Sequence, residues 1–118
     1  MGVSMDLEIT ADNTEEIKEI ARQQLLTALE AVGLQAEGNV KREIRRLNAI
    51  DTGRLLNSIT HGVDASDNTA YVGTNVDYAP YVEYGTSKME ARPYLKNGVQ
   101  KNTKQYKAIF ETYMKDEK

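Results

Sequence analysis

The chain contains no cysteine and no tryptophan, and it has one histidine and one phenylalanine among its 118 residues. Without cysteine it has no disulfide framework, no thiolate chemistry and no zinc site with sulfur ligands. No run approaches the ~20 consecutive apolar residues of a membrane helix, and the first residues lack the apolar core of a signal peptide. We therefore expect a protein made in a reducing cytoplasm, without an export signal and without a membrane span.

The net charge of −3 is unevenly distributed, because residues 96–118 carry +3 and residues 1–95 carry −6. An acidic chain is not typical of a dedicated nucleic-acid-binding protein. The basic segment has two open interpretations, a helix whose lysines follow phosphates or an ordinary solvated helix face. The lysines concerned are Lys96, Lys101, Lys104, Lys107, Lys115 and Lys118.

The first half of the chain has the apolar spacing of a helix. The length of the whole chain predicts a single domain over residues 1–118. Apolar residues recur every three or four positions and predict one long helix over about 14–49. Gly33 and Gly38 disfavour a helix interior, so we expect a kink or a brief break near 33–38, with two helices joined by a loop as the alternative.

The second half begins with a period of two and ends with a helical period. Two alternating runs separated by a polar turn predict a β-hairpin over about 58–75. Pro80 excludes a central strand and fits a first helical turn within 76–84. Pro93 fits the first turn of a last helix over about 93–115, after a motif-rich region over 51–92. The order predicts an α+β fold, with helices packed on a small antiparallel sheet.

Residues suited to catalysis or metal binding are few. A Ser-His-Asp site would have to use His61, which lies within the expected hairpin, and no serine stands in a Gly-x-Ser-x-Gly motif. Asp64, Asp67 and Asp77 lack the spacing of a calcium loop and suit turns and caps. Gly73 and Gly85 belong to no phosphate-binding motif. We therefore expect no catalytic residue, no metal ligand and no cofactor.

The region over 51–95 concentrates tyrosine, glycine and threonine, with Tyr78, Tyr81 and Tyr84 close to Arg92. Tyrosine and arginine are enriched at protein–protein interfaces. The tyrosines can instead fill the core, and both interpretations hold if a ring is buried and its hydroxyl lies at an interface.

Three motifs in this region carry a family resemblance. They are Asp-Thr-Gly-Arg-Leu-Leu-Asn-Ser-Ile at 51–59, Tyr-Val-Gly-Thr-Asn at 71–75 continuing to Tyr-Ala-Pro-Tyr-Val-Glu-Tyr-Gly-Thr at 78–86, and Ala-Arg-Pro-Tyr-Leu at 91–95. Their order and spacing resemble those of the small phage tail-component or neck proteins, also described as gene-product-ten-like tail components. Tyr94 stands where phenylalanine is more usual in that family, which preserves an aromatic side chain.

The resemblance implies a non-enzymatic structural protein of a long-tailed bacteriophage or prophage. Such a protein assembles as a ring at the head–tail junction, around the DNA exit channel, and is present in the host cytoplasm during assembly. Its partners would be further copies of itself, the head connector and tail proteins. The motif residues implied as interface residues are Asp51, Thr52, Gly53, Leu55, Ser58, Gly73, Tyr78, Ala79, Tyr81, Glu83, Gly85, Thr86, Arg92 and Pro93.

Some of these residues have an expected physical role. Gly53 and Gly85 allow backbone conformations that a β-carbon opposes, and Glu83 and Arg92 suit a charge pair within a subunit or between subunits. Candidates for contact with channel DNA or an acidic partner are Lys96, Lys101, Lys104 and Lys107. The alternative function is a small nucleic-acid-binding protein that uses the basic C-terminal helix, and a hydrolase that depends on His61 comes third.

Overall fold

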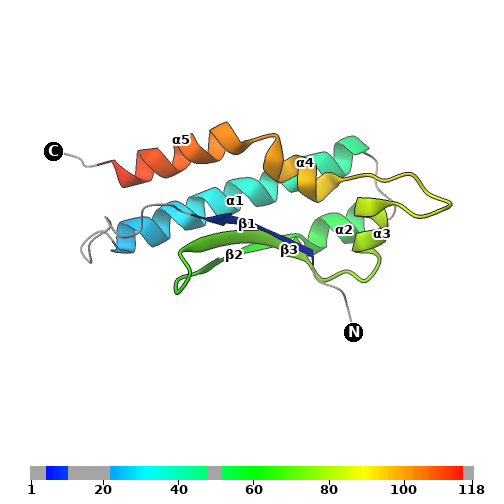
Figure 1. The fold of residues 1–118 in the computed structure, drawn as a ribbon, viewed down its shortest axis with the longest axis horizontal. Coiled ribbons are helices and arrows are strands. Elements are labelled where there is room, and N and C mark those ends of the chain that lie inside the picture. Colours follow the sequence, from blue (N-terminus) through cyan, green and yellow to red (C-terminus); the bar gives the residue numbers. More distant parts are fainter. Residues whose placement is uncertain (1–4, 11–21, 48–51, 116–118) are drawn as a thin grey trace.

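A computed structural model describes residues 5–10, 22–47 and 52–115 of the chain. The molecule is elongated, with principal-axis extents of 55 × 28 × 21 Å, and its longest helix runs along the long axis (Figure 1). In chain order the elements are β1 (Met5–Thr10), α1 (Arg22–Leu47), α2 (Thr52–Ser58), β2 (Thr60–Asp64), β3 (Thr69–Thr74), α3 (Ala79–Tyr84), α4 (Tyr94–Gln100) and α5 (Thr103–Met114).

Helix α1 is one unbroken helix through both of its glycines. The break expected near 33–38, and the alternative of two helices joined by a loop, are therefore wrong. A kink within the continuous helix stays a prediction. Gly33 is retained by packing, because a Cβ there would lie 2.9 Å from the ring of His61. The buried stripe of α1 keeps the predicted spacing, from Leu25 to Ile44. Residues 14–21 and 48–49, which the predicted helix included, lie outside the described residues.

The predicted hairpin is confirmed as β2 and β3, which pair antiparallel with His61 opposite Val72 and Val63 opposite Ala70. Asn68 closes the turn with a φ of 51°, a conformation that asparagine tolerates better than most residues. The sheet has a third strand that we did not predict. β1 pairs antiparallel with β3, and the strand order is β1-β3-β2.

The expected single C-terminal helix over 93–115 is two helices, α4 and α5, separated by Lys101 and Asn102. The chain has no apolar residue between Val99 and Tyr106, and side-chain hydrogen bonds to Gly98 hold the turn there. The amide of Asn102 donates to the carbonyl of Gly98 at 2.9 Å, and the hydroxyl of Tyr106 donates to the same carbonyl at 2.6 Å. These bonds stabilise the turn between the two helices.

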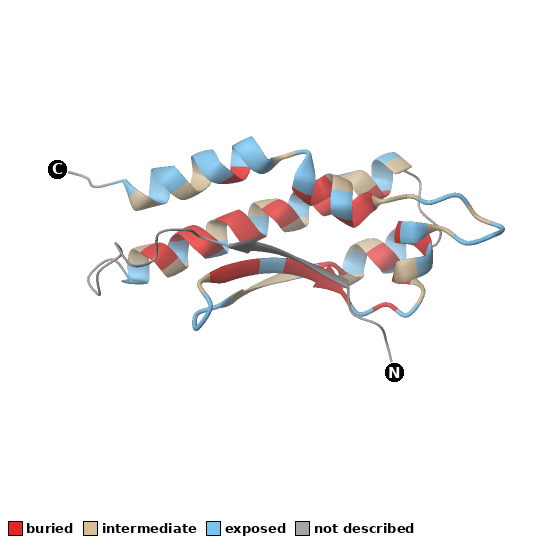
Figure 2. Cartoon of the chain, in the orientation of Figure 1, coloured by how far each residue is buried: buried red, intermediate tan, exposed pale blue. Residues whose placement is uncertain are grey.

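The helices cover one face of the sheet. α1 packs against β2 and β3, while α4 and α5 pack along α1, and α4 also lies beside β1. Phe110 and Met114 of α5 pack against a cluster that includes Ala70 of β3. The α+β class and the packing of helices on an antiparallel sheet are thus confirmed. Figure 2 shows the buried residues where α1 and the sheet face each other, with α5 largely exposed.

The core is mainly aliphatic rather than tyrosine-rich. Of the seven tyrosines, Tyr94 and Tyr106 are buried, and Tyr78 is half-buried. The largest fully buried side chains besides Tyr94 are leucines, isoleucine and valines, such as Leu25, Ile44 and Val72. The remaining four tyrosines are exposed, although Tyr71 lies over Gly62 of the neighbouring strand.

Candidate assembly surface

The first two motifs are joined by a chain of hydrogen bonds. The hydroxyl of Ser58, at the end of α2, donates to the carbonyl of Leu55 at 2.6 Å and accepts from the hydroxyl of Thr74 at 2.6 Å. Thr74 in turn accepts the backbone N–H of Val76 at 3.1 Å. Because Ser58 has one proton to donate, this arrangement fixes the direction of each bond. The serine therefore fixes α2 to the end of β3.

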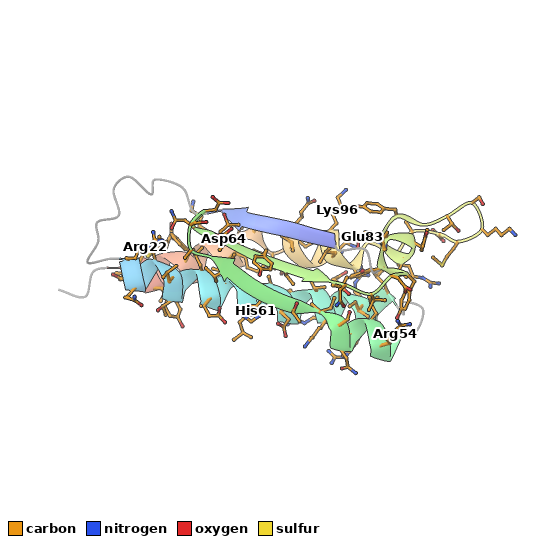
Figure 3. All side chains as sticks on the ribbon, turned by 90° about the horizontal axis from the view of Figure 1, so that it is seen from below. Arg22, Arg54, His61, Asp64, Glu83 and Lys96 are labelled. Atoms are coloured by element: carbon orange, nitrogen blue, oxygen red, sulfur yellow. The ribbon has the colours of Figure 1, made fainter. Side chains whose placement is uncertain are left out.

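Arg54 of α2 lies over the ring of Tyr78, with 5.2 Å from the guanidinium carbon to the ring centroid. A guanidinium at this distance is attracted to the negative face of the ring. The contact joins the helix of the first motif to the segment that begins the second. Arg54 is exposed, and Figure 3 shows it at the same end of the molecule as α3.

Glu83 is buried and binds the start of α4. Its two carboxylate oxygens accept the backbone N–H groups of Leu95 at 2.9 Å and Lys96 at 3.0 Å, and Figure 3 shows Glu83 and Lys96 close together. Burial raises the pKa of Glu83, although the two N–H donors and the charge of Lys96 oppose the rise. No ion pair joins Glu83 to Arg92 among the described residues. The charge pair expected within the subunit is therefore replaced by bonds to helix α4.

Gly85 ends α3 and begins the loop over 85–92. Its φ of 79° is a conformation that residues with a side chain rarely adopt, and a Cβ there would lie 2.8 Å from both the nitrogen of Ala91 and the oxygen of Met89. The loop is closed by a bridge between Thr86 and Met89, and the N–H of Arg92 donates to the carbonyl of Val82 at 2.7 Å. The expected need for glycine is confirmed at Gly85. It is wrong at Gly53, which lies within α2 without a positive φ and where a Cβ would meet nothing within 4 Å.

Two tyrosines of α3 project from this framework. Tyr81 is 59% exposed and Tyr84 is 74% exposed, whereas Ala79, Val82 and Glu83 of the same helix are buried. The buried side chains fix α3 against the core and leave the two rings outside. At the end of the molecule that carries α2, α3 and the 85–92 loop (Figure 1), the fold thus presents a fixed aromatic surface.

The predicted motif residues fall into three groups. Asp51 lies outside the described residues, and only the backbone of Thr52, within α2, is described. Pro93 directly precedes α4 rather than lying in its first turn. Buried are Leu55, Gly73, Ala79 and Glu83; half-buried are Ser58, Tyr78, Gly85, Arg92 and Pro93; exposed are Gly53, Tyr81 and Thr86. Most of the described motif residues lie at the end of the molecule formed by α2 and α3, and Gly73 lies near the end of β3.

The four candidate lysines are exposed and lie along α4 and α5. Lys101 pairs with Glu43 of α1 at 3.9 Å. Lys104 and Lys107 are on α5, and Lys96 is in the first turn of α4. The predicted single helix is broken at Lys101, which lies in the turn between α4 and α5, so the four lysines do not lie on one continuous helix face.

His61, labelled in Figure 3, lies between two carboxylates of α1. Its Nδ1 is 2.7 Å from Glu37 and its Nε2 is 2.7 Å from Glu30. Burial would lower the pKa of His61, but hydrogen bonds to Glu37 and Glu30 outweigh this effect and raise it. Burial likewise would raise the pKa of Glu37, but hydrogen bonds from His61 and Lys41 outweigh it and lower the pKa. The imidazole therefore binds β2 to α1, a role that the sequence pattern did not predict.

Residues 5–10, 22–47 and 52–115 contain neither a candidate metal site nor a candidate membrane-spanning helix. There, no cluster of three or more histidine, aspartate and glutamate side chains has an arrangement that could hold a metal ion. In the same residues, no helix is long and apolar enough to span a membrane.

Comparisons with known proteins identify a family for this chain. The family model described as "Bacteriophage HK97-gp10, putative tail-component" matches residues 10–85, which is more than half of the chain. The match includes α2, the hairpin and α3, and it ends at Gly85, before the 91–95 motif. Neither the curated proteins nor the solved structures contain a significant match. The chain belongs to the HK97-gp10-like family of bacteriophage tail components.

Proposed function

We propose that this protein is a neck or tail-completion subunit that joins the head of a long-tailed phage or prophage to its tail. It assembles as a ring of identical copies at the head–tail junction and performs no catalysis. Membership of a tail-component family supports a structural role in the virion. The joining role and the ring are our extension of that membership.

The observation that carries the proposal is the contrast within α3. Val82 and Glu83 are buried and hold the helix in place, while Tyr81 and Tyr84 are exposed. Exposed aromatic side chains on a rigid support are typical of protein–protein interfaces, where tyrosine is a frequent hot-spot residue. A subunit whose motif residues build such a surface is suited to assembly.

The partners that we propose are other copies of this chain, the head connector and tail proteins. A ring of identical subunits uses a heterologous contact, in which one surface of each copy meets a different surface of the next. We also propose that Lys104 and Lys107 contact packaged DNA or an acidic partner, because both are exposed and the segment that carries them is basic.

Antibody labelling of virions tests the proposed location. Gold-labelled antibodies against the purified protein, applied to intact phage and to separated heads and tails, should mark the junction end of one of the separated parts. Labelling along the whole tail, at the distal tail tip, or of no particle would contradict the proposal. Antibodies against a head protein provide the control for accessibility.

A further inference from the structure

Helix α1 carries an apolar side chain that the fold does not bury. Leu34 is 60% exposed, whereas the stripe from Leu25 to Ile44 is buried against the sheet and α4. Glu30 precedes Leu34 by one helical turn. One of its carboxylate oxygens lies 2.7 Å from Nε2 of His61, and the side chain is nevertheless 59% exposed. Leu34 is therefore an apolar residue beside an acidic one on an open helix face.

One turn after Leu34, Gly38 has no intramolecular explanation. A Cβ at Gly33 would meet His61 at 2.9 Å, and one at Gly98 would meet Val40 at 2.7 Å, so packing requires those two glycines. A Cβ at Gly38 would meet nothing within 4 Å. A glycine inside a helix is unfavourable relative to alanine, and it leaves a shallow notch in the helix surface. We call Glu30, Leu34 and Gly38 the α1 notch.

The α3 surface, defined as Tyr81, Tyr84 and Lys88, has the complementary properties. Its two rings project from a helix that is fixed to the core, and Lys88 is exposed in the loop that follows. Arg54 lies at the same end of the molecule. The surface therefore offers aromatic rings with Lys88 at its edge, and the exposed Glu90 follows Lys88 by two positions in the same loop.

From these two surfaces we infer that the α3 surface of one copy docks on the α1 notch of the next copy. A tyrosine ring packs on Leu34 over the space left by Gly38, and Lys88 faces Glu30. The arrangement has an apolar centre and a charged rim of opposite signs, as stable interfaces commonly do. Because the two surfaces differ and lie on different elements, the contact is heterologous and propagates from copy to copy, as a ring requires. The inference rests on the self-assembly proposed above and names the residues that meet.

Cysteine cross-linking tests the contact directly, because the wild-type chain contains no cysteine. Thr27→Cys, one turn before Glu30, and Ser87→Cys, next to Lys88, leave the proposed contact residues in place. The two variants are made as separate proteins, mixed, and treated with a short bifunctional maleimide. Such a linker tolerates a wider separation than a disulfide, which needs Cα atoms within about 7 Å. Both side chains are exposed, so both variants should fold. We expect a cross-linked dimer in the mixture of the two variants.

The control pairs Thr27→Cys with Tyr113→Cys, since Tyr113 is also exposed but lies near the end of α5. This mixture should give no more cross-linked dimer than Thr27→Cys alone. Equal yields from both mixtures, or no dimer from Thr27→Cys with Ser87→Cys, would overturn the assigned contact.

A second variant tests the contact without cross-linking. Leu34→Asp, at an exposed position, should leave the fold intact and weaken self-association by about tenfold or more, while Tyr113→Asp should leave self-association unchanged. Self-association of Leu34→Asp equal to that of the wild type would refute the contact and leave the proposed location in the virion standing. Antibody labelling away from the junction would refute the proposed function, whatever the cross-linking shows.

Discussion

The carboxylate of Glu83 on α3 accepts the backbone N–H of Leu95 at 2.9 Å, and its second oxygen accepts the N–H of Lys96. The position that supports the exposed tyrosines is therefore tied to the first turn of α4. Glu83→Gln leaves one oxygen for two donors, and we expect the free energy of unfolding to fall by about 1–3 kcal/mol. Urea denaturation measures this. Glu90→Gln, on the exposed loop, should have almost no effect, and equal stability of both variants would contradict the assigned role.

The pair of carboxylates around His61 predicts a pH dependence. A histidine whose pKa is raised on folding contributes its full stabilisation below the pKa of the unfolded chain, and this is lost as the pH rises through the folded pKa. Since the pKa of His61 is raised from 6.5, stability should fall as the pH rises above that value. Urea midpoints measured between about pH 6 and about pH 9 test this.

His61→Gln provides the matched comparison for the pH dependence, because it keeps a polar side chain that does not titrate. Its unfolding midpoint should vary less than that of the wild type in the same pH range. If both proteins lose stability equally on alkalinisation, the imidazole does not hold β2 to α1 through its charge.

Two helical glycines, Gly98 and Gly38, differ in whether a Cβ would fit, and comparing them tests the packing of α4 on α1. At Gly98 a Cβ would lie 2.7 Å from the Cα of Val40, so Gly98→Ala forces α4 away from α1 and should destabilise the protein by about 1–3 kcal/mol. At Gly38 the space is open, so Gly38→Ala should stabilise the isolated subunit by about 1 kcal/mol through helix propensity. The midpoint of thermal unfolding, measured in dilute protein, compares the two variants. A shift of the midpoint in the same direction in both variants would contradict the close approach of α4 to α1.

Two buried tyrosines differ in whether their hydroxyl has a partner. The hydroxyl of Tyr106 donates to the carbonyl of Gly98 and accepts the amide of Asn39 at 3.0 Å. The hydroxyl of Tyr94 has no hydrogen-bond partner among the described residues. Tyr106→Phe should therefore lower the free energy of unfolding by about 1–3 kcal/mol. Tyr94→Phe should leave the free energy of unfolding unchanged or raise it. Urea denaturation of both variants separates the two cases, and a larger loss at Tyr94 would be contrary to this assignment.

The elements that were predicted correctly have a strong local signal. The apolar stripe of α1 and the alternation of β2 and β3 around a polar turn are patterns within the element itself. β1 was missed although Met5, Leu7 and Ile9 alternate with polar residues, since that short run gains its stability from pairing with β3, more than 50 residues away along the chain.

The break between α4 and α5 shows a second limit of structure prediction from the sequence. Roughly helical spacing on both sides of Asn102 suggested one helix, and the turn depends on contacts of Gly98 with Val40 and Tyr106 that no local pattern contains. At the candidate surface, the motifs identified the region, whereas the role of Glu83 depends on a residue twelve positions away. That Leu34 is exposed and that Gly38 has open space around it could be known only once the fold showed what surrounds them.

The most direct test of the joining role is electron microscopy of a lysate from a phage that lacks this gene. We expect DNA-filled heads beside separate, complete tails, or heads without tails, and we expect the wild-type gene supplied in trans to restore whole particles. Normal infectious particles in the absence of the gene would contradict the account.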